Sequence, residues 1–588
     1  MFKFSELQYV RPDVQALSAL IVDSAEALGK AQSYEETRKI FLNYKSAYTE
    51  YATMQNVASI RNTVDTRDTY YEEEMNFFNQ ENPKLALLVR QLNEALLACP
   101  YRAELEKEYG ELYFRNMEVQ KQFADERIVE DQIRESKLTQ KYSKVSATAS
   151  ISFRGEECNF YGLLKHMQST DRELRRDAFQ AWAELYSRIA PELDAIYDEM
   201  VHLRHGMAKK LGFSSYTDMA YLRRRRYDYK AEDAANFRQQ VKEIVTPAVH
   251  KLFLRQAESL GVDKLRYYDE ALSYPEGNPV PQGNRDELVA KAQKMYREMS
   301  PLTGEFFDAM VEHQLFDLET KPGKRPGGYC TSLPAYKLPF IFSNFNGTSA
   351  DVDVLTHEAG HAFESYLATR TQPLTDLASS TSEINEIHSM TMEHFAYPWM
   401  ELFFGDQCEK YLYSHLVGAL SVIPYMVTVD EYQHRVYEKP DMTAMERRAV
   451  WHELEQEYMP WRDYDGNEFL EQGGFWMQKQ HIFLYPFYYI EYALAQIGAF
   501  EWIALIPALS VIFTLIPDPT VRYRRLYGLG LGFFWPFFAV NFHWFFYMYP
   551  LDFAGMPRAA SAVVVTVACL GLSLFQALGA ALLFPLMG

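Results

Sequence analysis

The sequence predicts a mainly α-helical protein with a small β element and an apolar helical tail, and three observations predict it. Through residues 1–320, apolar side chains recur at intervals of three and four, the spacing of one face of an α-helix. Only two short segments, 145–153 and 339–347, are rich in residues that favour strands. From residue 499 onward the chain is almost continuously apolar, which is typical of membrane-spanning or fully buried helices.

Length and charge limit the organisation of the chain and its partners. A chain of 588 residues is too long to fold around a single hydrophobic core. We therefore expect an N-terminal helical cap (1–115), a second helical domain (116–498) and the tail (499–588). The formal net charge of −20 argues against nucleic acid as a partner. The five scattered cysteines include no C-x-x-C pair, and no secretory signal is visible, so we expect a cytoplasmic protein without a disulfide framework.

Before residue 320 the helical pattern is interrupted at a few places. Residues 85–97 form an apolar-periodic segment, and Asn82-Pro83 is expected to break the chain before it. The alternating run at 145–153 predicts a strand or one arm of a hairpin. The run Arg223-Arg224-Arg225-Arg226 is typical of a solvated helix end or of internal ion pairs with Asp and Glu, so it does not predict nucleic-acid binding.

The chain then changes from helix to loop and strand. Residues 322–329 are rich in Gly and Pro and predict a turn-rich loop, whereas 339–347 predicts a short strand. A strand beside a helix can bind an extended peptide by edge pairing through main-chain hydrogen bonds. Gly327 and Gly328 lack side chains and are therefore expected to let a substrate backbone approach closely.

An H-E-x-x-H motif follows this strand and is the strongest chemical signal in the chain. Residues four apart on a helix lie one above the other, so His357 and His361 offer two imidazole nitrogens to one ion. Glu358 lies beside them, where it can act on a water molecule, and this arrangement is typical of a metalloprotease zinc site. Thr348 and Asp351 predict a capping box at the start of the helix.

A catalytic zinc ion takes three protein ligands and leaves one position open. A carboxylate from a second helix, after a short connection, is the natural third ligand. The spacing leaves four candidates open: Glu364, Glu383, Glu386 and Glu393. We expect His388 and His394 to pack in the core or support the ligands rather than to bind the metal.

A third polar group lies at residues 481–492, where one histidine is followed by four tyrosines. Peptide hydrolysis builds negative charge on the carbonyl oxygen, which phenol or imidazole donors stabilise. The candidate donors are His481, Tyr485, Tyr488, Tyr489 and Tyr492. The alternative is a buried aromatic helix. The Gly473-Gly474 pair upstream predicts a loop that positions this segment.

Together these motifs resemble the thimet-oligopeptidase-like (M3) zinc metallopeptidases, and within them the oligoendopeptidase F group, over residues 1–498. The motifs are specific in combination, although H-E-x-x-H alone is shared by many zinc enzymes. They are residues 323–329, 344–348, 357–363, 383–390 and 481–492.

The resemblance implies a helical fold of the zincin type, with a deep substrate channel and one zinc ion per chain. It implies Glu386 as the third ligand, because the family places this ligand 29 residues after its first histidine, here His357. It implies Glu358 as general base and acid, and His481 and Tyr489 as catalytic donors. The channel would admit short unstructured peptides and exclude folded proteins. Further substrate contacts are implied for Tyr485, Tyr488 and Tyr492.

The resemblance ends near residue 498, where the family continues with charged helices that complete its catalytic domain. Three apolar stretches follow that approach or exceed the length needed to cross a bilayer. They are residues 502–517, 526–551 and 559–587. Arg522, Arg524 and Arg525 would place the first loop between them in the cytoplasm. Residues 532–583 resemble the amino-terminal membrane part of apolipoprotein N-acyltransferases, without the catalytic domain of those enzymes.

The tail has two explanations. One is a membrane-anchored peptidase. The other, which we favour, is a fusion of a truncated peptidase to an unrelated membrane fragment, because the change falls inside what should be a packed catalytic helix. The expected function is zinc-dependent endopeptidase activity on short oligopeptides, with membrane association only through the tail. The alternatives are a catalytically impaired membrane-anchored chimera or scaffold, and a related zinc carboxydipeptidase or aminopeptidase.

Overall fold

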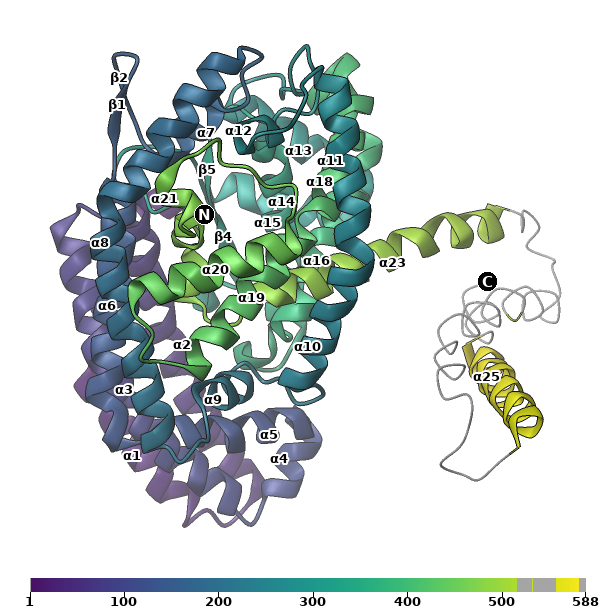
Figure 1. The fold of residues 1–588 in the computed structure, drawn as a ribbon. Helices are drawn as coiled ribbons and strands as arrows, with labels where there is room; N and C mark the ends of the chain where they lie inside the picture. The colour runs from purple at the N-terminus through teal and green to yellow at the C-terminus, as the bar shows by residue number, and fades with distance from the viewer. Residues whose placement is uncertain (1, 515–530, 532–556, 581–588) are drawn as a thin grey trace. The chain divides into compact units, whose positions relative to one another are not determined.

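The computed structural model describes residues 2–514, 531 and 557–580 (Figure 1). The chain forms two compact units, Met1–Phe500 and Glu501–Gly588. Helices dominate the described residues, and the strands belong to one small two-stranded and one small three-stranded sheet. The prediction of a mainly helical fold with a small β element is therefore confirmed.

The N-terminal part of the first unit consists of five helices around one hydrophobic cluster. They are α1 (Val14–Leu28), α2 (Tyr34–Val64), α3 (Thr69–Ala98), α4 (Arg102–Tyr109) and α5 (Glu111–Gln120). The predicted break at Asn82-Pro83 is wrong, because α3 continues through Pro83, which is buried. Proline removes one backbone hydrogen bond from a helix. The packing of α3 against α1 and α2 offsets that loss.

The next segment joins two long helices that pack on each other, α6 (Val129–Thr148) and α8 (Arg172–Lys210). An antiparallel hairpin of β1 (Ile151–Phe153) and β2 (Glu156–Cys158) lies between them in the chain. The strand predicted at 145–153 therefore starts later than expected, because α6 extends through Thr148. The other helices of this part are α7 (Phe160–His166), α9 (Tyr216–Arg223), α10 (Ala231–Gln240), α11 (Thr246–Leu260), α12 (Tyr267–Glu270), α13 (Arg285–Met299) and α14 (Pro301–Glu312).

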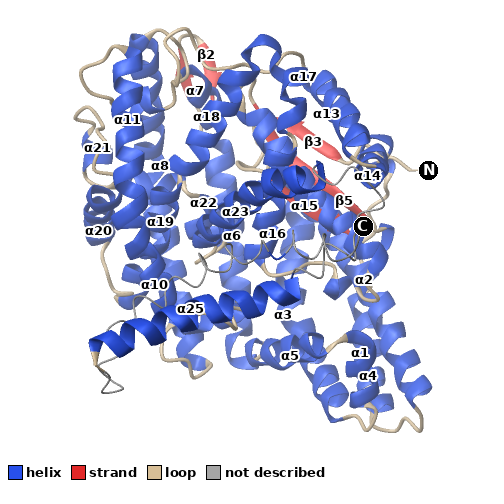
Figure 2. Ribbon diagram, turned by 90° about the vertical axis from the view of Figure 1, so that its right-hand side faces the viewer, coloured by secondary structure: helices blue, strands red, loops and turns tan. Residues whose placement is uncertain are grey.

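A three-stranded sheet with the order β3-β5-β4 packs beside helix α15 (Figure 2). Its strands are β3 (Phe316–Glu319), β4 (Tyr329–Leu333) and β5 (Leu338–Phe345). Strand β5 is parallel to β3 and antiparallel to β4, and its residues are all buried. The strand predicted at 339–347 is thus the central one, with both edges paired. The edge that a peptide can reach belongs to β4, which the sequence had marked only as the end of a loop.

Helices α15 (Ala350–Thr371) and α16 (Ser382–Phe395) lie against each other, and the remaining helices of the first unit follow them in the chain. They are α17 (Met400–Phe404), α18 (Cys408–Ser421), α19 (Ile423–Glu438), α20 (Ala444–Tyr458), α21 (Glu468–Glu471), α22 (Gln480–Leu484) and the start of α23 (Tyr489–Thr514).

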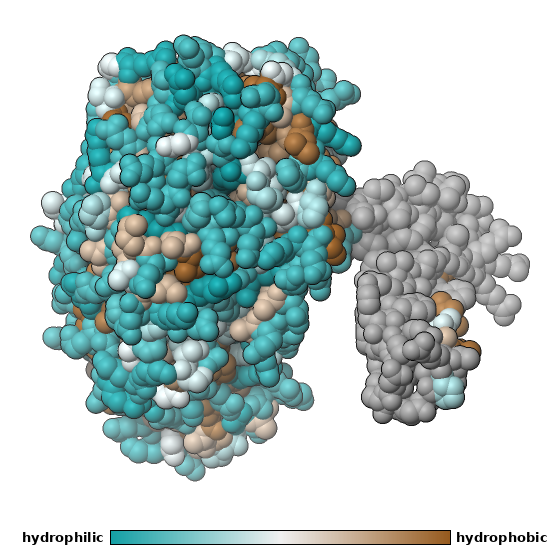
Figure 3. All heavy atoms as spheres, viewed as in Figure 1, coloured by the Kyte–Doolittle hydropathy of each residue, from teal (hydrophilic) through white to brown (hydrophobic). Residues whose placement is uncertain are grey.

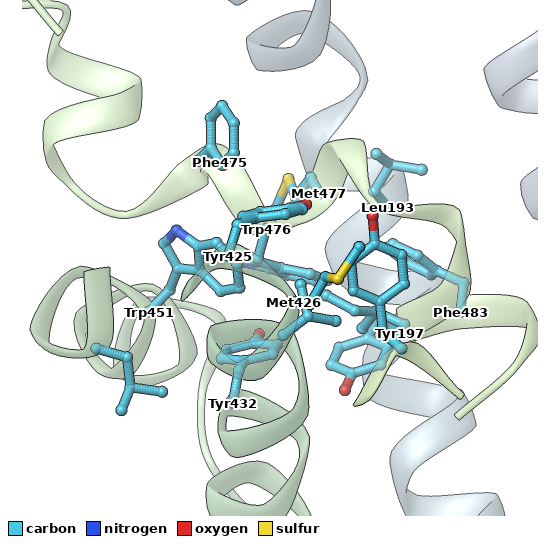
Figure 4. Packing of buried hydrophobic residues seen from close by; sticks show 14 of the residues in the cluster. Leu193, Tyr197, Tyr425, Met426, Tyr432, Trp451, Phe475, Trp476, Met477 and Phe483 are labelled. Carbon is cyan, nitrogen blue, oxygen red and sulfur yellow. The ribbon is translucent and has the colours of Figure 1, made fainter. Parts of the chain in front are cut away.

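An aromatic core fixes α22 against α8 and α19 (Figure 4). The Trp476 ring stacks on Phe483 of α22, with centroids 5.4 Å apart, and also contacts Tyr197 of α8 and Tyr432 of α19. The segment that carries His481 is therefore held by core packing rather than left as a mobile loop.

Hydrophilic residues cover most of the first unit's visible face in Figure 3, in keeping with the net charge of −20.

The predicted membrane spans fall only partly on described residues. The first, 502–517, overlaps the end of α23, and the third, 559–587, overlaps α25 (Arg558–Ala580). The second, 526–551, and the arginines before it lie outside the described residues, apart from residue 531.

One described helical stretch, Ser382–Glu438, is long and apolar enough to cross a bilayer, and a shorter apolar helix covers Ala562–Leu574. The longer stretch contains α16, whose Glu386 is buried and whose Glu393 is largely buried in the polar site described below. Core helices of folded domains pass the same test of length and composition, so we take this stretch as core.

Candidate metal centre

The turn between β5 and α15 fixes the start of the motif helix, although not as predicted. Ser349 occupies the N-cap without a side-chain hydrogen bond, so the capping box of Thr348 and Asp351 is wrong. The Asp351 carboxylate instead accepts hydrogen bonds from the backbone N–H groups of Asn346 (2.9 Å) and Gly347 (2.8 Å). A carboxylate in the first turn of the helix thus holds the loop that joins β5 to α15.

His357 and His361 of α15 and Glu386 of α16 converge on one point. Glu386 Oε2 lies 3.2 Å from His357 Nε2 and 3.4 Å from His361 Nε2. Ligands about 2.0–2.1 Å from a tetrahedral zinc ion stand about 3.3–3.4 Å apart. The three side chains therefore fit three corners of a zinc site. They are the only group of this kind among the residues that the structure describes.

Close packing of the two helices brings Glu386 to the two histidines. A Cβ atom at Gly360 would lie 2.6 Å from Ser389 Cα and 3.1 Å from the His388 carbonyl oxygen. Glycine at this position therefore lets α15 and α16 approach to a distance that a side chain would prevent. Glu386 lies one turn before Ser389 on α16, so this contact sets its distance from the histidines.

The other candidate ligands have different places. Glu364 lines the same cavity but lies outside the group of three. Glu383 accepts a hydrogen bond from the Tyr229 hydroxyl. The His394 ring packs against Tyr397, His415 and Phe500, and His388 is only partly buried beside α15. The geometry thus selects Glu386 from the four carboxylates that the sequence left open.

Glu393, the fourth candidate carboxylate, orients the His357 ring by contacting Nδ1, the ring nitrogen that does not face Glu386. Its Oε1 lies 2.6 Å from His357 Nδ1, and its Oε2 lies 2.9 Å from His415 Nε2. Tyr397 contacts the other ring nitrogen of His415 at 2.7 Å. Burial alone would raise the pKa of Glu393, but the hydrogen bonds from the two histidines hold it at about 2. A charged acceptor at Nδ1 leaves His357 Nε2 free for a metal.

Sequence reasoning missed this supporting role of Glu393 and the part played by His415. A signal for the first was present, because Glu386 and Glu393 are seven residues apart and share one face of α16. His415 lies on α18, and nothing in its local sequence indicates the contact.

Glu358 lies beside the histidines with one carboxylate oxygen unpaired. Its Oε2 is buried and has no hydrogen-bond partner among the described residues, and burial raises the pKa of Glu358. A Cβ atom at Gly328 would lie 3.2 Å from Glu358 Oε1, so the missing side chain leaves room at this carboxylate. Gly327 has a different role, because a Cβ atom there would lie 2.2 Å from Gln480 Nε2. Gly327 therefore packs against the Gln480 side chain, which lines the cavity described below, and its contact with a substrate stays a prediction.

A cavity of about 420 Å³ opens at these side chains. The edge strand β4 forms one wall, and His481, Tyr485, Tyr488 and Tyr492 lie on its lining. The Tyr488 hydroxyl donates to Glu386 Oε1, and the Tyr492 hydroxyl lies 3.2 Å from His481 Nε2. Burial lowers the pKa of His481 to about 3, so its ring is neutral at pH 7.

Tyr489 does not line this cavity among the described residues. Its ring packs against His481, with centroids 4.9 Å apart, and against Tyr425 of α19 at 5.8 Å. Of the five predicted donors, the structure therefore brings four to the cavity and places Tyr489 behind His481.

Comparisons with known proteins match two peptidase family models to this chain between residues 4 and 505. The family described as "Peptidase M3 N-terminal domain" matches residues 4–124, and "Peptidase family M3" matches residues 165–284 and 287–505. Oligopeptidase PepF of Bacillus subtilis (strain 168) is 22% identical over 537 residues, which cover 84% of this chain and 74% of that protein. Nothing in the comparisons supports the resemblance of residues 532–583 to apolipoprotein N-acyltransferases.

Solved structures agree with these matches. A structure described as an oligoendopeptidase F superposes with a TM-score of 0.84 at 45% identity, covering 85% of this chain and 88% of that one. PZ peptidase A with an inhibitor superposes with a TM-score of 0.83 at 44% identity, covering 85% and 89%. An oligoendopeptidase F from Bacillus anthracis str. Ames gives 0.79 at 40% identity, covering 85% and 88%.

Proposed function

We infer the reaction of this chain from its family and its site: the chain belongs to peptidase family M3 and is an oligoendopeptidase F-like metallopeptidase. Its family implies zinc as the metal and oligopeptides as substrates. We propose that one zinc ion per chain is held by His357, His361 and Glu386. The observation that carries this proposal is the pair of separations of 3.2 and 3.4 Å from Glu386 Oε2 to the two histidine nitrogens, at a cavity wall.

Glu358 serves as general base and then general acid in this proposal. Zinc, when bound, supplies a Lewis acid that activates water near neutral pH and polarises a carbonyl group. Glu358 takes a proton from the attacking water and passes it to the leaving amine. Burial raises the pKa of Glu358, which favours a carboxylate that can both accept and release a proton. Its unpaired Oε2 is the atom available to that water.

The aromatic segment supplies donors to the carbonyl oxygen. His481 is neutral, so one ring nitrogen carries a proton that it can donate without bringing a charge into the buried site. Tyr488 and Tyr492 have hydroxyl groups at the same wall and can turn from their present partners toward a substrate. Tyr485 is 42% exposed and contacts the substrate farther from the reacting bond. Tyr489 supports the His481 ring by packing, in place of the donor role predicted from sequence.

The edge of β4 positions the substrate. Residues Tyr329 to Leu333 pair with β5 on one side, and the other side lines the cavity. An extended peptide can pair with this edge through main-chain hydrogen bonds, whatever its side chains. Short unstructured peptides therefore fit, and folded proteins do not. We propose a cytoplasmic location and no nucleic-acid partner, with membrane contact only through residues 499–588.

The test uses the full-length chain and an internally quenched peptide that is blocked at both ends. We expect cleavage at an internal bond, loss of cleavage after chelation, and recovery when one equivalent of zinc is restored. Blocked ends distinguish an endopeptidase from an aminopeptidase or a carboxydipeptidase. A chain that binds zinc but leaves the peptide intact would support the impaired chimera. A chain that binds no zinc would overturn the proposed function.

A further inference from the structure

A second cavity, of about 540 Å³, adjoins the metal cavity. Arg325 and Tyr485 line both cavities, so the two are neighbours at these side chains. The wall of the second cavity is unusually rich in charged residues. They are Glu72, Glu135, Lys144, Arg223, Arg224, Arg225 and Arg325.

Both acidic groups of this wall are already paired. Lys144 Nζ lies 2.8 Å from Glu72 Oε1. Glu135 Oε1 lies 2.6 Å from Nε of Arg204, which is buried. Neither carboxylate is left to neutralise a further cation.

One arginine of the wall is paired as well. Arg224 Nη2 lies 2.6 Å from Glu491 Oε2, and the neighbouring Arg226 lies 2.8 Å from the other oxygen of the same buried carboxylate. The ion pairs predicted for the run 223–226 are therefore present at these two positions. They also tie the end of α9 to α23, and so fix the arginines on either side.

Three guanidinium groups remain. Among the described residues, no carboxylate lies within 4.0 Å of Arg223, Arg225 or Arg325, and Arg223 acts on Glu135 only at longer range. Arg325 lies over the Tyr329 ring at 4.8 Å, and its buried Nε has no hydrogen-bond partner there. Arg223 is exposed, and Arg225 Nη2 donates to the Ser380 carbonyl oxygen at 3.2 Å, so among the described residues none of the three charges is neutralised by a carboxylate in contact.

The backbone at Arg225 gives a second, independent observation. Arg225 has φ of 60°, the left-handed conformation that favours glycine. Helix α9 ends there in a Schellman motif, with Arg226 N–H donating to the Tyr221 carbonyl and Arg225 N–H to the Leu222 carbonyl. An arginine at this position carries strain that glycine would avoid. Such strain is retained where the side chain has a task.

We propose that Arg223, Arg225 and Arg325 bind a carboxylate of the peptide substrate. This inference rests on the proposed function and names its substrate class. Guanidinium groups recognise a carboxylate through paired, charge-assisted hydrogen bonds. The ligand carboxylate supplies the negative charge that the cavity wall lacks.

The sheet edge indicates which end of the peptide reaches these arginines. Antiparallel pairing is more stable than parallel pairing, so a bound peptide runs opposite to β4. Its C-terminal part then points toward the N-terminal end of β4, where Arg325 lies. The Cβ position of Gly328 faces Glu358 Oε1, and Arg325 precedes Gly328 by three residues that include the bends at 326 and 327. The carboxylate therefore belongs on the C-terminal side of the cleaved bond.

Three quenched peptides that differ only at the last residue test this proposal. The first has a free C-terminal carboxylate, the second a C-terminal amide, and the third an amide preceded by Asp. We expect the wild-type enzyme to prefer the free acid to the amide by about tenfold or more in kcat/KM, as charge-assisted hydrogen bonds do. If the Asp peptide regains the preference, a side-chain carboxylate suffices; if it does not, the site reads the chain terminus. Equal kcat/KM for acid and amide would overturn the proposal.

Variants show whether the arginines cause the preference. In Arg223→Gln/Arg325→Gln the acid-to-amide ratio is expected to fall toward one. Arg297→Gln is the matched control, since Arg297 is an exposed arginine of α13 that lines neither cavity and pairs with Asp308 at 2.8 Å. The single variant Arg223→Gln, whose guanidinium has no ion pair in the described structure, serves if the double variant does not fold. A ratio that persists in a folded variant would refute the assignment.

A binding measurement separates this inference from the proposed function. Anisotropy of labelled acid and amide peptides on Glu358→Gln reports affinity without turnover. Tighter binding of the acid by a wild-type chain that cleaves neither peptide would sustain the carboxylate site and reject the peptidase reaction. Equal affinity for the acid and the amide peptide, together with normal cleavage of both, would reject the carboxylate site and sustain the peptidase reaction.

Discussion

Substitution of Gly360 by alanine tests how the metal site is assembled. The added Cβ atom would lie 2.6 Å from Ser389 Cα, whereas carbon atoms in contact are about 3.5–4.0 Å apart. Both groups belong to helix backbones, so α15 and α16 must separate by roughly 1 Å. The distances from Glu386 Oε2 to His357 Nε2 and His361 Nε2 would then rise from 3.2 and 3.4 Å to about 4.2 and 4.4 Å.

That increase exceeds what one zinc ion can span. Bonds of about 2.0–2.1 Å join ligands that are at most about 4.2 Å apart even on opposite sides of the ion, and about 3.4 Å apart in a tetrahedron. We therefore expect Gly360→Ala to weaken zinc binding by at least about tenfold, or about 1.4 kcal/mol. Stability is a poorer readout, because overpacking costs about 1–3 kcal/mol while alanine in a helix regains about 1 kcal/mol over glycine.

The assay is a competition titration of the metal-free protein with a chromophoric zinc chelator. Gly206→Ala is the matched control, because Gly206 is inside α8 and a Cβ atom there would meet nothing within 4 Å. We expect this control to bind zinc as the wild type does and to unfold at the same or a higher temperature. Unchanged zinc affinity in a folded Gly360→Ala protein would show that helix approach at this glycine does not set the ligand distances.

Three further predictions concern buried carboxylates. Glu358→Gln should bind one zinc ion and lose about 10²- to 10⁴-fold in kcat on the quenched peptide, and a parallel loss of zinc would count against its role as base. Glu393→Gln removes the charged acceptor at His357 Nδ1, so zinc affinity should fall roughly 10- to 100-fold in the same titration, and no change would exclude the supporting role. Burial raises the pKa of Glu455 to about 7, so the folded state holds a proton that the unfolded chain releases near pH 4.3, and stability falls as pH rises through this window. Urea unfolding at about pH 5 and pH 8 should show a smaller decline in Glu455→Gln than in the wild type, and equal declines would assign the effect elsewhere.

The two histidine ligands could be predicted from sequence because their geometry is local. A spacing of four on one helix fixes two side chains without knowledge of the rest of the fold. The third ligand is not local, since four carboxylates met the spacing requirement. The close approach of α15 and α16 at Gly360 and Ser389, which no local pattern shows, brings Glu386 rather than the others to the two histidines.

The sheet and the aromatic segment show a similar limit. Apolar residues identify β5 as a strand, but the order β3-β5-β4 depends on pairing between distant segments, so the open edge was assigned to the wrong strand. Tyrosines at 485, 488, 489 and 492 have a spacing that leaves the inward face undecided. Tyr489 turns away from the cavity because its ring packs against Tyr425, which is remote in sequence.

The positions of the site residues along the chain have a consequence for how the enzyme forms. The three proposed metal ligands lie on two consecutive α-helices, within 30 residues of chain, whereas His481 joins them from almost a hundred residues later. Closing a short loop costs less chain entropy than closing a long one, and local contacts form first. Metal capture can therefore precede the docking of the aromatic segment during folding. A newly made chain would hold its ion before it can hydrolyse anything, so ion content and catalytic competence are acquired at separate times.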